Sequence, residues 1–155
     1  MDNFYMNLEN VKNLIIKHEG FRAKPYTCPA GKLTIGYGFN IESEGVPRIV
    51  ADYWLDYLLK VQFIPFLQKI FPEFKYFSEN RKAALISMVY NIGETRFLEF
   101  RKMIKAINDG NWVTAASEAE NSKWARSDVP KRAAEVVKLF LEVQKSRDLV
   151  DFLTS

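Results

Sequence analysis

The sequence contains one cysteine and one histidine, and this scarcity excludes several kinds of chemistry. With Cys28 alone, no disulfide can form within the chain, so the fold must be held together by packing. One His and one Cys cannot supply the nitrogen and sulfur ligands of a zinc centre, and we expect no metal site. The phosphate-cradling motif G-x-x-x-x-G-K-[ST] is absent as well, and no cofactor is expected.

Long basic runs and long apolar runs are also lacking. Lys and Arg number 22 against 19 Asp and Glu, which gives a net charge of +3, and the basic residues are scattered. A nucleic-acid-binding domain usually carries a concentrated basic stripe, so we expect no nucleic-acid partner. Residues 1–6 hold an acid where a signal peptide is basic, and Lys17 stops the apolar run 14–16. We therefore expect neither a signal peptide nor stable membrane insertion.

What remains is the composition of a soluble globular protein, with 48% hydrophobic, 26% charged and 14% aromatic residues. A chain of 155 residues fits one domain, which can still fold as two lobes. We found no internal repeat and no low-complexity tract.

An amphipathic helix is predicted near the amino terminus, because apolar positions recur at steps of three and four residues. Asn7 is placed to cap its start and Gly20 to end it. Glu19 continues the inward stripe formed by Leu8, Val11, Leu14, Ile15 and His18. Burial is unfavourable for a carboxylate unless a cation neutralises it, which makes Glu19 a candidate functional residue.

A β-hairpin is predicted over residues 24–40, with its turn at 29–32. The return strand alternates, with Leu33, Ile35, Tyr37 and Phe39 on one face and Thr34, Gly36, Gly38 and Asn40 on the other. Glycine in a strand often marks a close approach of a ligand or of backbone. From this feature alone, a ligand groove and a bulged edge strand are equally good interpretations.

The rest of the chain is predicted to be helical. A connecting helix is expected over about 47–71, kinked or ended at Pro65. A helical lobe over about 78–145 follows, in which Ser78 caps a central helix, Gly93 ends it and Pro130 opens the last helix. The tail, 146–155, retains apolar residues that could dock as a final turn or two.

Two kinds of catalysis fit these residues. A carboxyl group that faces a hydroxyl and little bulk suits general-acid protonation of a leaving oxygen, as glycoside cleavage requires. Such cleavage usually uses a second carboxylate, and the hairpin offers Cys28 instead. A Cys28–His18 nucleophilic pair is the weaker alternative, because His18 falls on the inward stripe and no third group orients it.

The sequence resembles a known family at these same positions. Glu19 is followed nine residues later by Cys28 and six further on by Thr34, within the run Thr-Ile-Gly-Tyr-Gly. This spacing is similar to the Glu, Asp-or-Cys, Thr pattern of phage-type lysozymes, the endolysins of glycoside hydrolase family 24. Residues 84–95 resemble the central-helix signature of that family, and further matches occur at Trp112, Ser122, Lys123, Trp124 and the run 130–132.

The resemblance implies a lysozyme-like α+β fold: a small N-terminal lobe with a β-hairpin (about 8–46), a connecting helix and an all-helical C-terminal lobe, with a cleft between the lobes. It implies hydrolysis of the β-1,4 bond between N-acetylmuramic acid and N-acetylglucosamine. Glu19 would be the general acid, Arg132 its ion-pair partner, and Thr34 would hold the attacking water or the sugar. Cys28 stands where many members carry Asp, and Phe39 where the prototype has a histidine.

Substrate contacts implied by the resemblance are Asn40 from the hairpin and Tyr90 and Asn91 from the helical lobe. The partner would be bacterial peptidoglycan, and we expect a monomer. Made in the host bacterial cytoplasm without a signal peptide, the protein would reach the cell wall in the periplasm after release by another protein. Two alternatives stay open: a peptidoglycan-binding protein with little or no turnover, and an enzyme that cleaves chitin.

Overall fold

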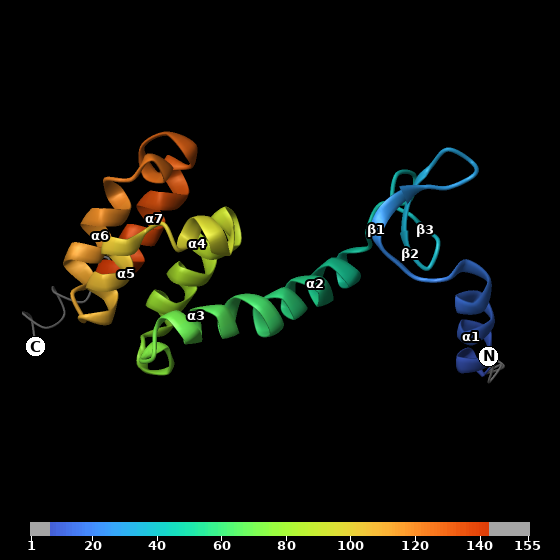
Figure 1. Ribbon diagram of the computed structural model, residues 1–155, viewed down its shortest axis with the longest axis horizontal. Coiled ribbons are helices and arrows are strands. Elements are labelled where there is room, and N and C mark those ends of the chain that lie inside the picture. Colours follow the sequence, from blue (N-terminus) through green and yellow to red (C-terminus); the bar gives the residue numbers. More distant parts are fainter. Residues whose placement is uncertain (1–6, 143–155) are drawn as a thin grey trace, which may run out of the picture. The chain divides into compact units, whose positions relative to one another are not determined.

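Residues 7–142 are described by the structure, a computed structural model, and they belong to two compact units. Unit 1 comprises Met1–Trp54 and unit 2 comprises Leu55–Ser155. The described part of unit 1 holds a helix, three strands and the start of a second helix, and the helices drawn from yellow to red in Figure 1 belong to unit 2. The expected α+β class, with a small antiparallel sheet followed by helices, is confirmed. Within residues 7–142, no helix is long and apolar enough to cross a membrane.

Helix α1 (Leu8–Glu19) has the ends that the sequence predicts. The Asn7 side chain accepts a hydrogen bond from the Glu9 N–H at 3.1 Å, and the Gly20 N–H donates to the Ile16 carbonyl at 2.8 Å. The expected burial of its apolar stripe and of Glu19 is not found, because α1 has no buried side chain.

The sheet in unit 1 has short strands, and Thr34 is the one buried residue among residues 7–54.

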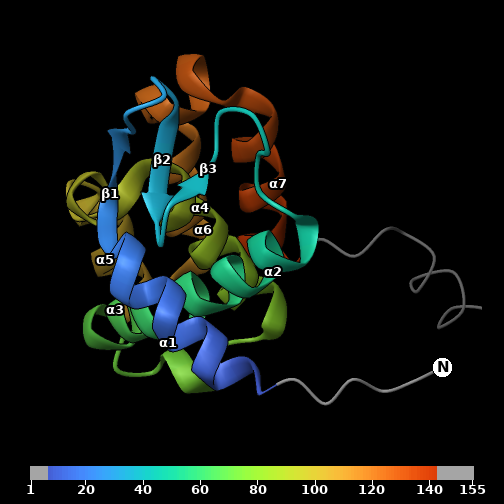
Figure 2. The same cartoon turned by 90° about the vertical axis from the view of Figure 1, so that its right-hand side faces the viewer.

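The strands form one antiparallel sheet in the order β1-β2-β3, which Figure 2 shows side by side. Strand β1 (Arg22–Thr27) pairs with β2 (Leu33–Gly36) around the expected turn, and β2 pairs with β3 (Phe39–Asn40). A bulge interrupts the β1–β2 register between Arg22 and Tyr26. The first turn is closed by the Cys28 N–H, which donates to the Lys32 carbonyl at 2.9 Å.

The continuous return strand expected up to Asn40 is wrong, because the chain reverses at Tyr37 and Gly38. Because Ile35 pairs with Phe39, three residues form the loop, and its last residue, Gly38, has a φ of +78°, a left-handed conformation that glycine adopts without strain. As a result Asn40 lies on a third strand directly opposite Thr34. The two residues expected on one face of a single strand are therefore cross-strand neighbours.

The connecting helix is continuous in backbone but not uniform. Helix α2 (Arg48–Tyr57) passes into a π-helical turn, η1 (Leu58–Phe63), and then into α3 (Ile64–Ile70). Pro65 lacks an N–H and its ring crowds the carbonyl four residues earlier, so a wide turn just before it relieves the clash. The sequence predicts the position of this irregularity but not its form.

The described part of unit 2 contains five further helical segments and a short 3-10 turn. These are η2 (Phe74–Tyr76), α4 (Glu79–Phe97), α5 (Arg101–Asn108), α6 (Trp112–Glu120), the π-helical turn η3 (Trp124–Asp128) and α7 (Pro130–Leu141). Ser78 caps α4 as expected, and Gly93 breaks its helical backbone with φ 79° and ψ 162°. The predicted docking of the tail lies outside the described residues.

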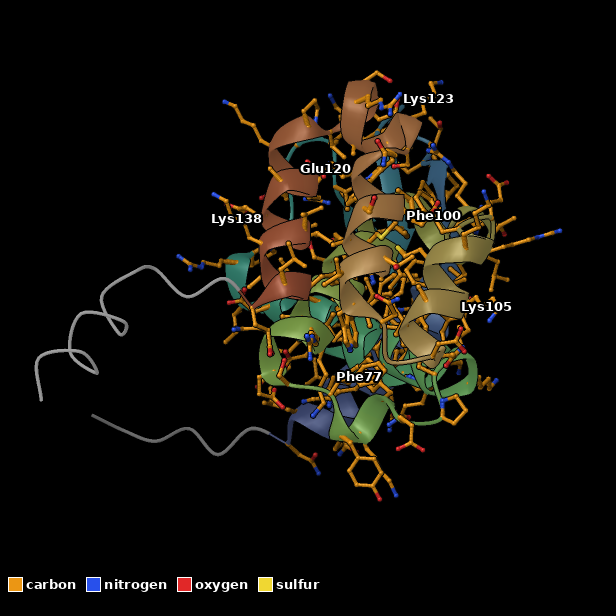
Figure 3. The ribbon with its side chains drawn as sticks, turned by 90° about the vertical axis from the view of Figure 1, so that its left-hand side faces the viewer. Phe77, Phe100, Lys105, Glu120, Lys123 and Lys138 are labelled. Atoms are coloured by element: carbon orange, nitrogen blue, oxygen red, sulfur yellow. The ribbon has the colours of Figure 1, made fainter. Side chains whose placement is uncertain are left out.

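The buried core lies in unit 2. Its largest fully buried side chains are Trp124, Phe71, Phe97, Phe140, Leu67, Leu85, Met88, Met103, Ile107, Val89 and Val136. Figure 3 shows Phe77 and Phe100 among the helices, while Lys105, Lys123 and Lys138 lie at their outer side. Arg81 joins three segments, since its Nε donates to the Phe140 carbonyl at 3.0 Å and its guanidinium lies 4.4 Å from the Trp112 ring centroid.

Candidate active site

Glu19 is the last residue of α1, and its exposed carboxylate lies against the hairpin turn of unit 1. A β-carbon placed on Gly38 would be 2.7 Å from Oε2 of Glu19, closer than real side chains allow. The ring of Phe21, two residues after Glu19, lies 5.4 Å from the ring of Tyr37. The carboxylate therefore has a defined neighbour in the turn between β2 and β3.

Cys28 lies at the end of β1, half-exposed, in the turn that joins β1 to β2. The pKa of its thiol is lowered, first by a hydrogen bond from the backbone of Lys32 and then by the Thr34 side chain, while partial burial acts in the opposite direction. A lowered pKa raises the thiolate fraction near neutral pH. Thr34 thus lies near Cys28 within unit 1, and the catalytic roles expected of the two residues stay predictions.

Thr34 is 3% exposed and is the one buried polar residue in the part of the chain that the structure describes. Its hydroxyl donates to the Lys32 carbonyl at 3.0 Å. A hydroxyl has a single hydrogen, so it cannot donate to the Cys28 sulfur at the same time. The backbone of Lys32 therefore remains the main cause of the lowered pKa of Cys28, and the lone pairs of Thr34 stay available as acceptors.

Asn40 has a structural role in addition to the expected substrate contact. Its Oδ1 accepts a hydrogen bond from the Ser43 N–H at 3.1 Å, which shapes the chain after β3. Glu42 closes the same region, because its Oε2 accepts from the Leu33 N–H at 2.9 Å. No sequence pattern indicated Glu42, whose hydrogen bond to Leu33 holds the first residue of β2, directly after Lys32.

In unit 2, Tyr90 and Asn91 lie near the middle of α4 and both are exposed. Tyr90 is 48% exposed, and its ring packs edge-on against Phe63 at a centroid distance of 5.6 Å. Each could meet a ligand from the solvent side. The substrate contacts expected of these two residues stay predictions.

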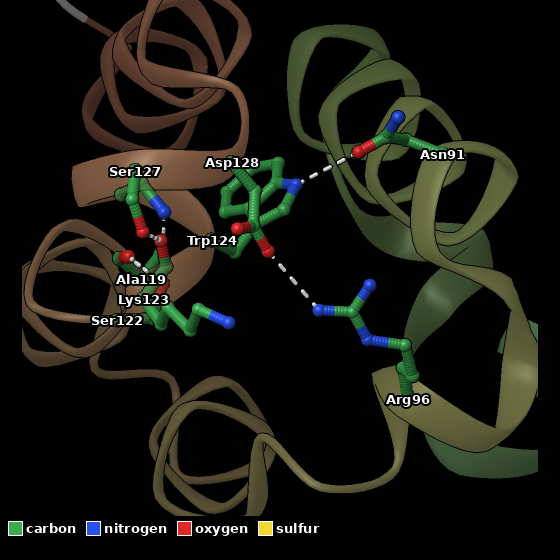
Figure 4. Close-up of polar contacts among 9 residues, drawn as sticks. Asn91, Arg96, Ala119, Ser122, Lys123, Trp124, Ser127 and Asp128 are labelled. Carbon is green, nitrogen blue, oxygen red and sulfur yellow. Dashed lines mark hydrogen bonds and ion pairs between the residues drawn. The ribbon is translucent and has the colours of Figure 1, made fainter.

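Asn91 has a firm partner within unit 2. The indole Nε1 of the buried Trp124 donates to Oδ1 of Asn91 at 2.9 Å, and a guanidinium nitrogen of Arg96 lies 3.2 Å from Oδ2 of Asp128 (Figure 4). Both contacts tie η3 to α4. Sequence reasoning missed them, because the partners are more than thirty residues apart and no local pattern pairs them.

Arg132 is half-buried on the first turn of α7. It lines a cavity of about 320 Å³ together with Ser87, Lys131, Glu135, Val136 and Leu139. The cavity thus carries two cationic side chains and one carboxylate. The ion pair expected between Arg132 and Glu19, and the cleft expected between the lobes, stay predictions.

Comparison with known proteins connects these residues to a family. The sequence model of the family described as Phage lysozyme matches residues 16–138, a stretch that contains every candidate site residue named above. The endolysin of Acyrthosiphon pisum secondary endosymbiont phage 1 is 29% identical over 117 residues, which is 75% of this chain and 77% of that protein.

Two proteins of Dictyostelium discoideum match a shorter stretch. Probable T4-type lysozyme 2 is 39% identical over 61 residues, and Probable T4-type lysozyme 1 is 34% identical over 64 residues. The first stretch covers 39% of this chain and 35% of that relative, and the second covers 41% of this chain and 37% of its relative. Because the family model spans well over half of the sequence, the chain belongs to the phage lysozyme family of lysozyme-type hydrolases.

Proposed function

We propose that the protein is an endolysin-type muramidase that hydrolyses the β-1,4 bond between N-acetylmuramic acid and N-acetylglucosamine in bacterial peptidoglycan and thereby lyses the cell. The observation that carries the proposal is the family match over residues 16–138, which includes Glu19, Cys28 and Thr34 at the spacing of the family's catalytic pattern. The lowered pKa of the Cys28 thiol in unit 1, caused chiefly by hydrogen bonding from the backbone of Lys32, supports it further.

In this proposal Glu19 is the general acid that protonates the leaving oxygen of the scissile bond. Its exposure at the end of α1 leaves the carboxylate accessible to a polymeric substrate. Cys28 is the second group, as a base toward water or as a nucleophile, and the lowered pKa of its thiol favours both roles over that of an inert thiol.

Thr34 holds the attacking water or the sugar through its hydroxyl oxygen, which is fixed in direction by its own hydrogen bond to Lys32. Tyr90 and Asn91 contact the glycan from unit 2, and Arg132 pairs with Glu19. Synthesis in the bacterial cytoplasm, release by another protein, action in the periplasm and a monomeric state complete the proposal.

The test measures turnover of purified peptidoglycan. Turnover is monitored by the release of reducing ends and by mass analysis of the fragments. Wild-type protein should release muramic-acid reducing ends, and Glu19→Gln should leave only a residual rate, lower by about 10²- to 10⁴-fold, while the circular-dichroism spectrum stays unchanged. Glu9→Gln is the matched control, because Glu9 is an exposed carboxylate at the other end of α1 that pairs with Lys12. Full activity of Glu19→Gln would exclude Glu19 as the acid.

Two outcomes separate the alternatives. Binding of peptidoglycan without release of fragments by the wild-type protein would favour a binding protein with little turnover. Faster release from chitin than from peptidoglycan, with both polymers offered at equal mass, would assign the enzyme to chitin.

A further inference from the structure

We infer that Gly38 is a positioning residue for the carboxylate of Glu19, which needs a hairpin turn without a side chain beside it. The inference rests on the proposed role of Glu19 as the acid. A β-carbon on Gly38 would lie 2.7 Å from Oε2, 3.0 Å from Cδ and 3.4 Å from Cγ of Glu19. The whole end of the glutamate side chain thus occupies the space that any other residue at position 38 would fill.

The backbone on both sides of this contact is fixed. Arg22 pairs with Gly36 in the sheet, and the rings of Phe21 and Tyr37 pack at 5.4 Å. These contacts hold the segment that follows Glu19 to the strand and turn that carry Gly38. A β-carbon at position 38 therefore cannot be accommodated by moving the turn away.

The part that can move is the Glu19 side chain, because its end is exposed and flexible. A substitution at Gly38 then disturbs the fold little but displaces the acid from its place over the turn. A displacement of about 1 Å at a catalytic group can cost on the order of 10²-fold in rate. The expected damage is thus to kcat and not to folding.

Glycine at position 38 has a second explanation that a test must separate. Its φ of +78° favours glycine whatever lies nearby. Gly45 supplies the control, since it lies in the same unit with a φ of +67°, and a β-carbon placed on it would have no other atom within 4 Å. Alanine at Gly45 brings comparable backbone strain without contact with Glu19.

The experiment compares Gly38→Ala with Gly45→Ala on soluble peptidoglycan fragments. Both variants should lose a similar amount of thermal stability. Gly38→Ala should lower kcat by about 10²-fold with KM within about twofold, while Gly45→Ala keeps kcat within about twofold. Gly38→Asn and Gly45→Asn repeat the comparison with a residue that tolerates positive φ, in case Gly38→Ala fails to fold.

A double-mutant cycle with Glu19→Gln separates a positioning role from a structural one. In the Glu19→Gln background, Gly38→Ala should lower the residual rate by less than about twofold, because the acid is already gone. Equal kcat for the Gly38 and Gly45 variants would overturn the inference, as would an undiminished effect of Gly38→Ala in the double mutant. Full activity of Glu19→Gln alone would instead remove the proposed acid.

Discussion

Trp124 donates its indole hydrogen to the side-chain oxygen of Asn91 at 2.9 Å, and this bond connects two segments of unit 2 that are 33 residues apart. The indole is 2% exposed, so its N–H has no ready access to water if the acceptor is removed. Asn91 thus has a measurable role in stability besides the substrate contact expected of it.

Asn91→Ala should lower the free energy of unfolding by about 1–3 kcal/mol, because a buried donor is left without an acceptor. Asn91→Asp retains an oxygen at that place and should lose less. Urea denaturation monitored by tryptophan fluorescence measures both, with the exposed Asn80→Ala on the same helix as control. Unaltered stability of Asn91→Ala would mean that the bond is dispensable. A raised KM of Asn91→Asp for peptidoglycan would separately support substrate contact.

Cys28 should react as a thiolate at lower pH than an ordinary cysteine, because hydrogen bonding from Lys32 lowers its pKa. The rate of alkylation by iodoacetamide, followed against pH, should inflect below about 8.5, the usual thiol value. Since the folded state favours the thiolate, Cys28 adds stability above the ordinary pKa, and this contribution is lost as the pH falls through the lowered pKa. An inflection at or above the ordinary value would contradict the hydrogen-bonded thiolate.

The role of Cys28 in catalysis has its own test. If the thiolate acts as base or nucleophile, Cys28→Ser should lose activity, because a serine hydroxyl does not ionise near neutral pH. Cys28→Asp restores the group that many members of the family carry, and should retain turnover. Unchanged activity of Cys28→Ser would rule out both thiolate roles and leave placement of water.

Thr34→Val should destabilise the protein by about 1 kcal/mol, since it removes the hydroxyl that donates to the carbonyl of Lys32. Turnover of peptidoglycan should fall strongly in Thr34→Val and persist in Thr34→Ser. Thr27→Val, at an exposed position on β1, is the control. Full turnover by Thr34→Val would exclude a role for the hydroxyl.

Arg132→Ala should lower kcat if the guanidinium pairs with Glu19, and Arg132→Lys should recover part of it, because lysine keeps the charge but not the planar fork. Lys131→Ala is the matched control, as Lys131 is the adjacent cation on the same cavity. Unfolding free energies should stay within about 0.5 kcal/mol for the Lys131 control. Equal activities of the Arg132 and Lys131 variants would argue against the pairing.

The ends of the helices could be predicted from sequence because local chemistry sets them. Asn7, Gly20, Ser78 and Pro130 act through bonds or backbone angles within a few residues, and the structure has each in its expected role. Glu19, Cys28 and Thr34 were chosen from their spacing, which resembles a family pattern, and their catalytic roles stay predictions.

The contacts that required the fold could not be predicted. Alternation up to Asn40 is compatible with a continuous strand and with a tight turn, since Gly36 and Gly38 permit either backbone. The approach of Glu19 to Gly38 depends on that turn. Burial along α1 was overestimated, because an apolar stripe shows which face of a helix can pack against other residues. It does not show whether other residues cover that face.

The π-helical turn η3 has a consequence for the evolution of chain length. The Val129 N–H bonds to the Trp124 carbonyl five residues earlier at 3.0 Å, so this turn holds one residue more than an α-helical turn would. Loss of one residue between Trp124 and Pro130 would convert it to an ordinary turn with both ends in place. Relatives should therefore tolerate a one-residue deletion here, while the same deletion inside α7 would rotate every later side chain by about 100°.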